Sequence, residues 1–331
     1  MLFLIEKEMS KYSLIDLPVY VQPEFYEINI SQVASALMNH GKVESVYRIG
    51  SVTAPGISDL DMLVVFKDGT STNHDPLKKL DDKGHYLFVH RLFGVSVSHF
   101  QNALGLAQFH NYRLIGGSDT RTEATLTPED DGLVKVQTAL EFMVKMYMVL
   151  NFQKEYRIIK VRAFLLEARA MEYDLQYLGI ASGPLFDVVN EIIDLRKKWF
   201  LSETNSLKIE DLFDRFNKYL TAFLGEVLLK EKFYTPHLSQ GKFVKNVRWS
   251  NGESLSLAKS GIPFPAFLAG LFHRRYFNMM NKLTGFTIKL PVHNDPPSIL
   301  EQRFSLLQEM KAYNKKHIPE FMAPGSSLNL G

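Results

Sequence analysis

The sequence contains no cysteine among its 331 residues and carries almost no net charge. The lack of cysteine excludes a disulfide framework, a thiolate zinc site and a cysteine nucleophile. Its 38 basic and 36 acidic residues leave a formal charge of +2. This balance argues against a strongly basic nucleic-acid-binding domain, although it allows a local basic patch. Carboxylates are therefore the metal ligands to look for in this chain.

Long apolar runs are also missing from the sequence. No run reaches the roughly 18 residues that a membrane-spanning helix needs. The apolar start of the chain is interrupted by Glu6 and Glu8 and lacks the basic-then-apolar order of a signal peptide. With 46% hydrophobic and 22% charged residues, the composition is that of a globular protein. We therefore expect a cytoplasmic protein without a membrane partner.

The residue pattern changes near residue 130. Before this point short apolar runs alternate with turns, and after it the apolar residues follow helical spacing. We expect an α+β fold, with a small mixed β-sheet domain over residues 1–130 that has helices on one side. Residues 131–331 would form a largely helical domain with a β-hairpin insert. A ligand cleft would lie between the two parts.

The expected elements follow from apolar spacing and from Gly and Pro breakers. Strands are predicted over 43–49, 60–66 and 94–100, and a hairpin over 242–258 with Asn251-Gly252 as its turn. Helices are predicted over 27–40, from 133 onward, and over 156–178, 184–201, 207–232, 264–282 and 297–315.

One stretch combines a Gly-Ser turn with paired carboxylates. Gly50 and Ser51 end the first strand, the seven residues VTAPGIS follow, and Asp59-Leu60-Asp61 leads into the second strand. Because strand side chains alternate with period two, Asp59 and Asp61 lie on one face and the apolar residues between them point into the core. The two carboxylates repel each other unless a cation lies between them, and magnesium prefers oxygen ligands. Gly50 lets a phosphate approach the backbone, and Ser51 offers a hydroxyl and an N–H.

This stretch resembles the signature of the DNA polymerase β-like nucleotidyltransferase superfamily. The resemblance covers residues 27–120, and its spacer is at the short end of the family range. It implies that Gly50 and Ser51 hold a nucleoside triphosphate such as ATP. It also implies that Asp59 and Asp61 are catalytic and bind Mg²⁺, with Mn²⁺ as a possible substitute. Helical domains that follow such folds often place a basic residue over the triphosphate. The resemblance therefore makes Lys160 a candidate nucleotide-binding residue. A solvated helix face is the other interpretation of that lysine.

The family pattern also has a third carboxylate on a following strand, which this sequence lacks. The expected strand over 94–100 carries Ser96 and Ser98 at alternating positions, and no acid lies between Asp82 and Asp119. A serine cannot replace the charge of a carboxylate, so the general base has no assigned residue.

Several residues remain candidates for that role. His90 or His99 is able to act as a base at neutral pH, and Asp119 or Glu123 is able to reach in from the next segment. The remaining alternative is that catalysis is lost while nucleotide binding is retained.

The leading interpretation is a magnesium-dependent nucleotidyltransferase. It would move a nucleoside monophosphate from a nucleoside triphosphate to the hydroxyl of an unknown acceptor, either a small molecule or a protein side chain. The near-neutral charge argues against a long nucleic acid as acceptor, because such binding depends on many phosphate contacts. The alternative is a catalytically degraded nucleotide-binding or scaffold protein with the same fold. A structural helical protein in which the Gly-Ser and Asp-x-Asp patterns are accidental is a third interpretation.

Overall fold

The computed structural model describes residues 10–107, 111–123, 126–201, 206–236, 240–244, 246–261 and 267–328. Residues 1–9, which include Glu6 and Glu8 and the apolar start of the chain, lie outside these ranges. Within them, no helix combines the length and apolarity that crossing a bilayer requires.

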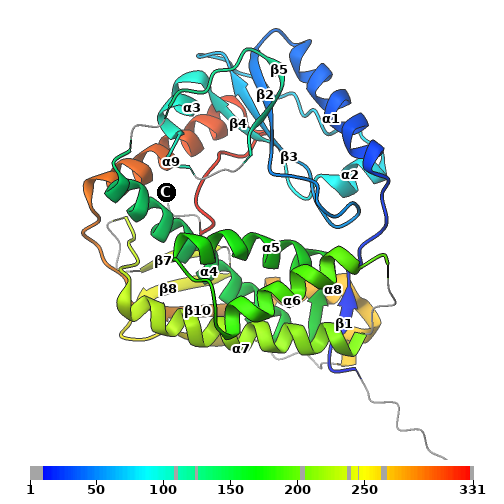
Figure 1. Ribbon diagram of the computed structural model, residues 1–331, viewed down its shortest axis with the longest axis vertical. Helices are drawn as coiled ribbons and strands as arrows, with labels where there is room; N and C mark the ends of the chain where they lie inside the picture. Colours follow the sequence, from blue (N-terminus) through cyan, green and yellow to red (C-terminus); the bar gives the residue numbers. More distant parts are fainter. Residues whose placement is uncertain are drawn as a thin grey trace, which may run out of the picture.

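The N-terminal part contains a four-stranded mixed sheet in the order β4-β3-β2-β5, in the upper half of Figure 1. Its strands are β2 (Val43–Ile49), β3 (Asp61–Phe66), β4 (Phe93–Ser96) and β5 (Arg113–Gly117). Strand β2 runs antiparallel to β3 and β5, whereas β3 and β4 run parallel. The strands predicted over 43–49 and 60–66 are confirmed as β2 and β3.

Both faces of this sheet are buried. Met62 and Val64 of β3 pack with helices α1 (Pro23–Met38) and α2 (Asp82–Leu87), whereas Leu63 and Val65 belong to the large core that continues into the helical part of the chain. The alternation of β3 side chains therefore directs the first residue of the strand, Asp61, toward the helical part.

The strand predicted over 94–100 is wrong in its second half. Strand β4 ends at Ser96, and helix α3 (Val97–Ala103) begins there. The Ser96 hydroxyl oxygen accepts a hydrogen bond from the His99 N–H at 3.3 Å, which is a helix N-cap. Ser98 lies in the first turn of α3 and donates to Asp68. The two serines therefore do not form a strand face beside Asp59 and Asp61.

The central part of the chain is helical. Helix α4 (Pro128–Tyr156) is followed by α5 (Val161–Tyr177), α6 (Pro184–Lys198) and α7 (Ser206–Lys230). The helix predicted over 156–178 starts later, because Arg157 takes a left-handed conformation with φ of 53°. The next three residues form β6 (Ile158–Lys160), which pairs in parallel with β1 (Ser13–Ile15).

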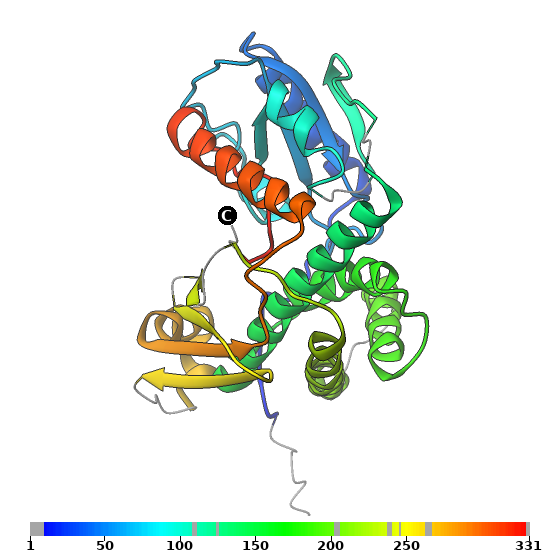
Figure 2. The ribbon, with the colours of Figure 1, turned by 90° about the vertical axis from the view of Figure 1, so that its left-hand side faces the viewer.

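A second four-stranded sheet lies below the first in Figure 2, in the order β7-β8-β10-β9. It comprises β7 (Gln240–Val244), β8 (Val247–Asn251), β9 (Ser256–Gly261) and β10 (Thr284–Leu290), with helix α8 (Phe267–Leu283) before β10. The predicted hairpin with an Asn251-Gly252 turn is wrong, because β10 lies between β8 and β9 and pairs with both. Strand β10 takes that position because its alternate side chains Phe286, Ile288 and Leu290 are buried in the main core.

The end of the chain returns to the N-terminal sheet. Helix α9 (Ser298–His317) lies near α3 and β4 (Figure 1). After it, Met322 exchanges backbone hydrogen bonds with Leu92 and Gly94 beside β4, and Phe321 joins the core above β3. The predicted α+β class is confirmed. The division at residue 130 stays a prediction, and residues from both sides of it build the N-terminal core.

Candidate metal centre

The Gly50-Ser51 turn, which is predicted to hold phosphate, has free space around its backbone. Gly50 has a φ of +70°, and a Cβ built on it would have no other atom within 4 Å. Ser51 is exposed. Across the β2–β3 pair, Ile49 lies directly opposite Asp61. The turn therefore starts at the same sheet edge as the carboxylates, because adjacent strands are about 4.8 Å apart.

Two arginines from the helical part hold the loop that leads to Asp59. Arg162 of α5 donates to the carbonyl oxygens of Ile57 and Ser58, both at 3.1 Å, and its guanidinium lies 3.9 Å from the centre of the Tyr86 ring. Arg196 of α6 donates to the Ser58 hydroxyl at 2.8 Å. Both arginines are buried. The position of Asp59 is thus fixed by helices that lie more than 100 residues later in the sequence.

Asp59, Asp61 and His90 lie together. Each offers one ligand atom, and these atoms are all within 4.8 Å of one another. His90 Nε2 is 2.8 Å from Asp61 Oδ1. His90 arrives there because it precedes β4, whose Phe93 lies opposite Leu63 of β3 in a parallel register. His90 lies three residues before Phe93 and is therefore beside the start of β3.

Burial and the charge of Asp61 raise the pKa of Asp59 to about 6. Burial acts to lower the pKa of His90, but the contact with Asp61 and the charge of that carboxylate outweigh it and raise the pKa to about 9. His90 is therefore protonated at neutral pH in the metal-free protein. Its imidazolium lies where a metal ion would offset the same negative charge.

The donor set fits a divalent cation. The Oδ1 atom of Asp61 is shielded from solvent, and its polar contact is the ion pair with His90. This contact leaves acceptor capacity on that oxygen unused. Carboxylate oxygens suit magnesium and manganese, whereas an imidazole nitrogen is a common ligand of transition metals. Nδ1 of His90 lies 2.7 Å from the Arg91 carbonyl oxygen, so Nδ1–H donates there and Nε2 faces the carboxylates.

Lys160 is placed by other contacts. Its Nζ is 3.8 Å from Asp16 Oδ2 and 5.5 Å from the centre of the Phe277 ring. These contacts connect it to the end of β1 and to α8 rather than to Gly50 or Ser51. Its predicted role above a triphosphate stays a prediction.

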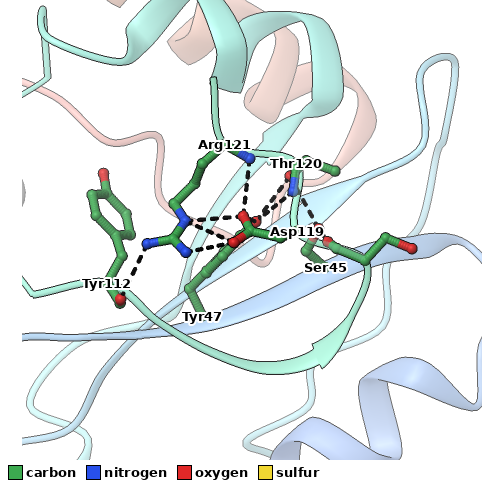
Figure 3. Close-up of polar contacts among 7 residues, drawn as sticks. Ser45, Tyr47, Tyr112, Asp119, Thr120 and Arg121 are labelled. Carbon is green, nitrogen blue, oxygen red and sulfur yellow. Dashed lines mark hydrogen bonds and ion pairs between the residues drawn. The ribbon is translucent and has the colours of Figure 1, made fainter. Parts of the chain in front are cut away.

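Asp119, a candidate for the third carboxylate, is engaged elsewhere. Its carboxylate accepts hydrogen bonds from Arg121 and, at 2.9 Å, from the Tyr47 hydroxyl (Figure 3). The hydrogen bonds from Arg121 hold the pKa of Asp119 well below its usual range. Glu123 is exposed on the same segment. His99, the other histidine candidate, contacts the Ser96 hydroxyl from α3 at 2.8 Å.

In the part of the chain that the structure describes, the group of possible ligands contains two carboxylates and a histidine, without a third acid. No model of a known protein family matches the chain, and a search of curated proteins finds no relative. An acidic group beside a mixed sheet is compatible with a polymerase β-like fold.

Sequence reasoning named His90 only as one of several possible bases and did not single out Arg196. Neither residue belongs to a short motif. His90 becomes recognisable once the start of β4 is known. Arg196 gives no sequence signal, because its role depends on how α6 packs against the loop before β3.

Proposed function

We propose that this protein is a divalent-cation-dependent nucleotidyltransferase. It would move a nucleoside monophosphate from a nucleoside triphosphate to an acceptor hydroxyl and release pyrophosphate. The observation that carries the proposal is the convergence of the open Gly50-Ser51 turn with Asp59, Asp61 and His90 at one edge of a mixed sheet. A phosphate chain laid along the turn would meet the carboxylates at that edge.

The chain's own residues would position the nucleotide. The open backbone at Gly50 admits a phosphate oxygen, and the Ser51 hydroxyl and N–H are available as donors. A bound Mg²⁺ or Mn²⁺ would offset the phosphate charge and stabilise the oxygens that attack and leave. Arg162 and Arg196 keep the loop before Asp59 in place, so the carboxylates are preorganised.

His90 gives the centre two modes of action. With Mg²⁺ held by the two carboxylates, the charge of the ion would replace that of the His90 proton and lower the pKa of the imidazole. The neutral Nε2 would then be able to accept a proton from the attacking hydroxyl. With Mn²⁺, the same nitrogen is also a suitable ligand. In either mode Nδ1–H stays on the Arg91 carbonyl oxygen.

The acceptor in this proposal is a small molecule or a protein side chain. The formal charge of +2 supports this choice over a long nucleic acid, which would need many phosphate contacts.

The first test is thermal unfolding with each nucleoside triphosphate, with and without Mg²⁺ or Mn²⁺. We expect at least one nucleotide to raise the melting temperature only when the metal is present, because a ligand at 100 times its Kd stabilises by about 2.7 kcal/mol. The Asp59→Asn/Asp61→Asn double variant should lose this shift. Asp295→Asn, an exposed acid outside the centre, should keep it.

The second candidate is a nucleotide-binding protein without transfer activity. The observation that favours it is that the described residues place a histidine, and no third acid, beside Asp59 and Asp61. Both candidates give the metal-dependent thermal shift, and the release of pyrophosphate with candidate acceptors separates them. If no nucleotide stabilises the native protein, both proposals fail.

A further inference from the structure

We propose that a cavity at the C-terminal sheet binds a compact polyanion, a small molecule that carries two or more phosphate groups. The cavity has a volume of about 470 Å³. It lies where the β7–β8 connection, the end of β9 and the start of β10 meet the last turn of α8. Its lining includes Lys242, Asn246, Arg248, Lys282, Phe286 and Thr287.

Among the described residues that line it, the cavity has three cations and no acid. Lys242 and Arg248 lie directly opposite each other in the antiparallel β7–β8 pair, and both are exposed. Within the described part of the chain, no carboxylate lies within 4.0 Å of either cation or of Lys282. Lys259 of strand β9, which β10 separates from β8, differs, because it forms an ion pair with Glu155 of α4.

Like charges opposite each other on adjacent strands destabilise a sheet. An anion between Lys242 and Arg248 would remove this repulsion and gain two charge-assisted contacts. Lys282 adds a third cation, but it also lies at the C-terminal end of α8, where a positive charge offsets the helix dipole. Lys242 and Arg248 therefore carry the inference.

The lining also indicates the size and chemistry of the occupant. A volume of about 470 Å³ is that of a small-molecule site rather than a macromolecular groove. Asn246 and Thr287 add an amide and a hydroxyl beside the cations, and the Asn246 amide keeps a second N–H besides the one that it donates to the Thr284 carbonyl oxygen. The aromatic residue of the lining, Phe286, is buried to 97% and offers no face on which a base would stack. Single-stranded nucleic acids depend on such stacking, so a compact phosphorylated molecule is the better fit.

The proposed polyanion site is independent of the candidate metal centre. The probe is tripolyphosphate, titrated by calorimetry into the Asp59→Asn/Asp61→Asn protein in buffer with a chelator. We expect saturable binding that weakens at least tenfold in the added Lys242→Gln/Arg248→Gln variant. Lys289→Gln is the matched control, because Lys289 is exposed on β10 but does not line the cavity.

The outcomes separate the alternatives. Absence of saturable binding, or equal binding by the Lys242→Gln/Arg248→Gln variant, overturns the proposal. Tighter binding of a 20-nucleotide single strand that competes with tripolyphosphate also overturns it, in favour of a nucleic-acid surface. A melting temperature for each variant shows that lost binding is not lost folding. If tripolyphosphate does not bind, the predicted nucleotide-dependent stabilisation at the candidate metal centre is not contradicted, because it is measured separately.

Discussion

Among single residues, His90 links the charge of the candidate metal centre to the stability of the fold. Its pKa is raised to about 9 in the folded protein, against an ordinary value of 6.5. The folded state therefore holds this proton more tightly than the unfolded state does. The stabilisation is fully present below about pH 6.5 and is lost as the pH rises through 9. Asp59, with its pKa raised to about 6 from 3.8, acts in the same direction at lower pH.

We predict that the metal-free protein becomes less stable between pH 6.5 and 9.5. The measurement is urea unfolding in a chelator at several pH values. In His90→Gln this part of the pH dependence should disappear, because the titrating group is gone. His85→Gln, an exposed histidine of α2, should follow the native curve. A native slope that survives in His90→Gln would contradict the assigned role.

At the scale of elements, the loop between β2 and β3 is defined by close backbone contacts. Gly56 has a φ of +84°, and a Cβ on it would lie 2.3 Å from the Val19 carbonyl oxygen. Its N–H donates to the Tyr26 hydroxyl at 2.8 Å, and its carbonyl oxygen accepts from Tyr86. The loop therefore has no room to adjust at this position.

We predict that Gly56→Ala lowers the free energy of unfolding by about 2–4 kcal/mol, because strained backbone and a steric clash add together. It should also weaken the Mn²⁺ binding that we propose for the candidate centre, since Asp59 follows three residues later. Gly179→Ala is the control: Gly179 has a φ of +68° but no atom within 4 Å of a built Cβ. It should cost only about 1–2 kcal/mol and leave Mn²⁺ binding unchanged. Equal losses in the two variants would show that the contact with Val19 is unimportant.

For the whole molecule, one buried ion pair connects the last helix to the central one. Arg303 of α9 donates to both carboxylate oxygens of Glu141 on α4, at 2.6 and 3.0 Å. Both side chains are 2% exposed or less. Arg303 also donates to the Leu106 carbonyl oxygen, and Gln137 donates to Glu141. The pair thus joins the segment after α3, the central helix and the C-terminal helix.

We predict that Glu141→Leu destabilises the protein by about 3–5 kcal/mol, because it leaves the Arg303 charge buried without a partner. The double variant Glu141→Leu/Arg303→Met should be more stable than Glu141→Leu alone. Chemical denaturation measures both. As a control, Asp211→Asn removes an exposed partner of Arg215 and should cost less than about 1 kcal/mol. A double variant less stable than the single one would show that the two charges are not coupled in this way.

Local patterns in the sequence were sufficient for much of the fold. Alternating apolar residues predicted β2 and β3, and helical spacing predicted α1 and α4 to α9 within a few residues. The Gly50-Ser51 turn and the pair Asp59 and Asp61 were recognisable because their chemistry lies within twelve consecutive residues. Period two predicted that both carboxylates share a strand face. Strand β3 begins only at Asp61, and the structure finds ligand atoms of Asp59 and Asp61 within 4.8 Å of each other.

The tertiary structure decided what depends on contacts between distant segments. His90 joins the centre through the parallel register of β3 and β4, and Arg196 reaches the loop through the packing of α6. Strand β10 separates β8 from β9 because its apolar face is buried against the helical core. Local propensity does not predict these three contacts, since each depends on which segments lie side by side. The sequence by itself identified Asp59 and Asp61 as candidate ligands and excluded cysteine ligands. Only the fold showed that His90 lies beside the two carboxylates, because that contact depends on the register of β3 and β4.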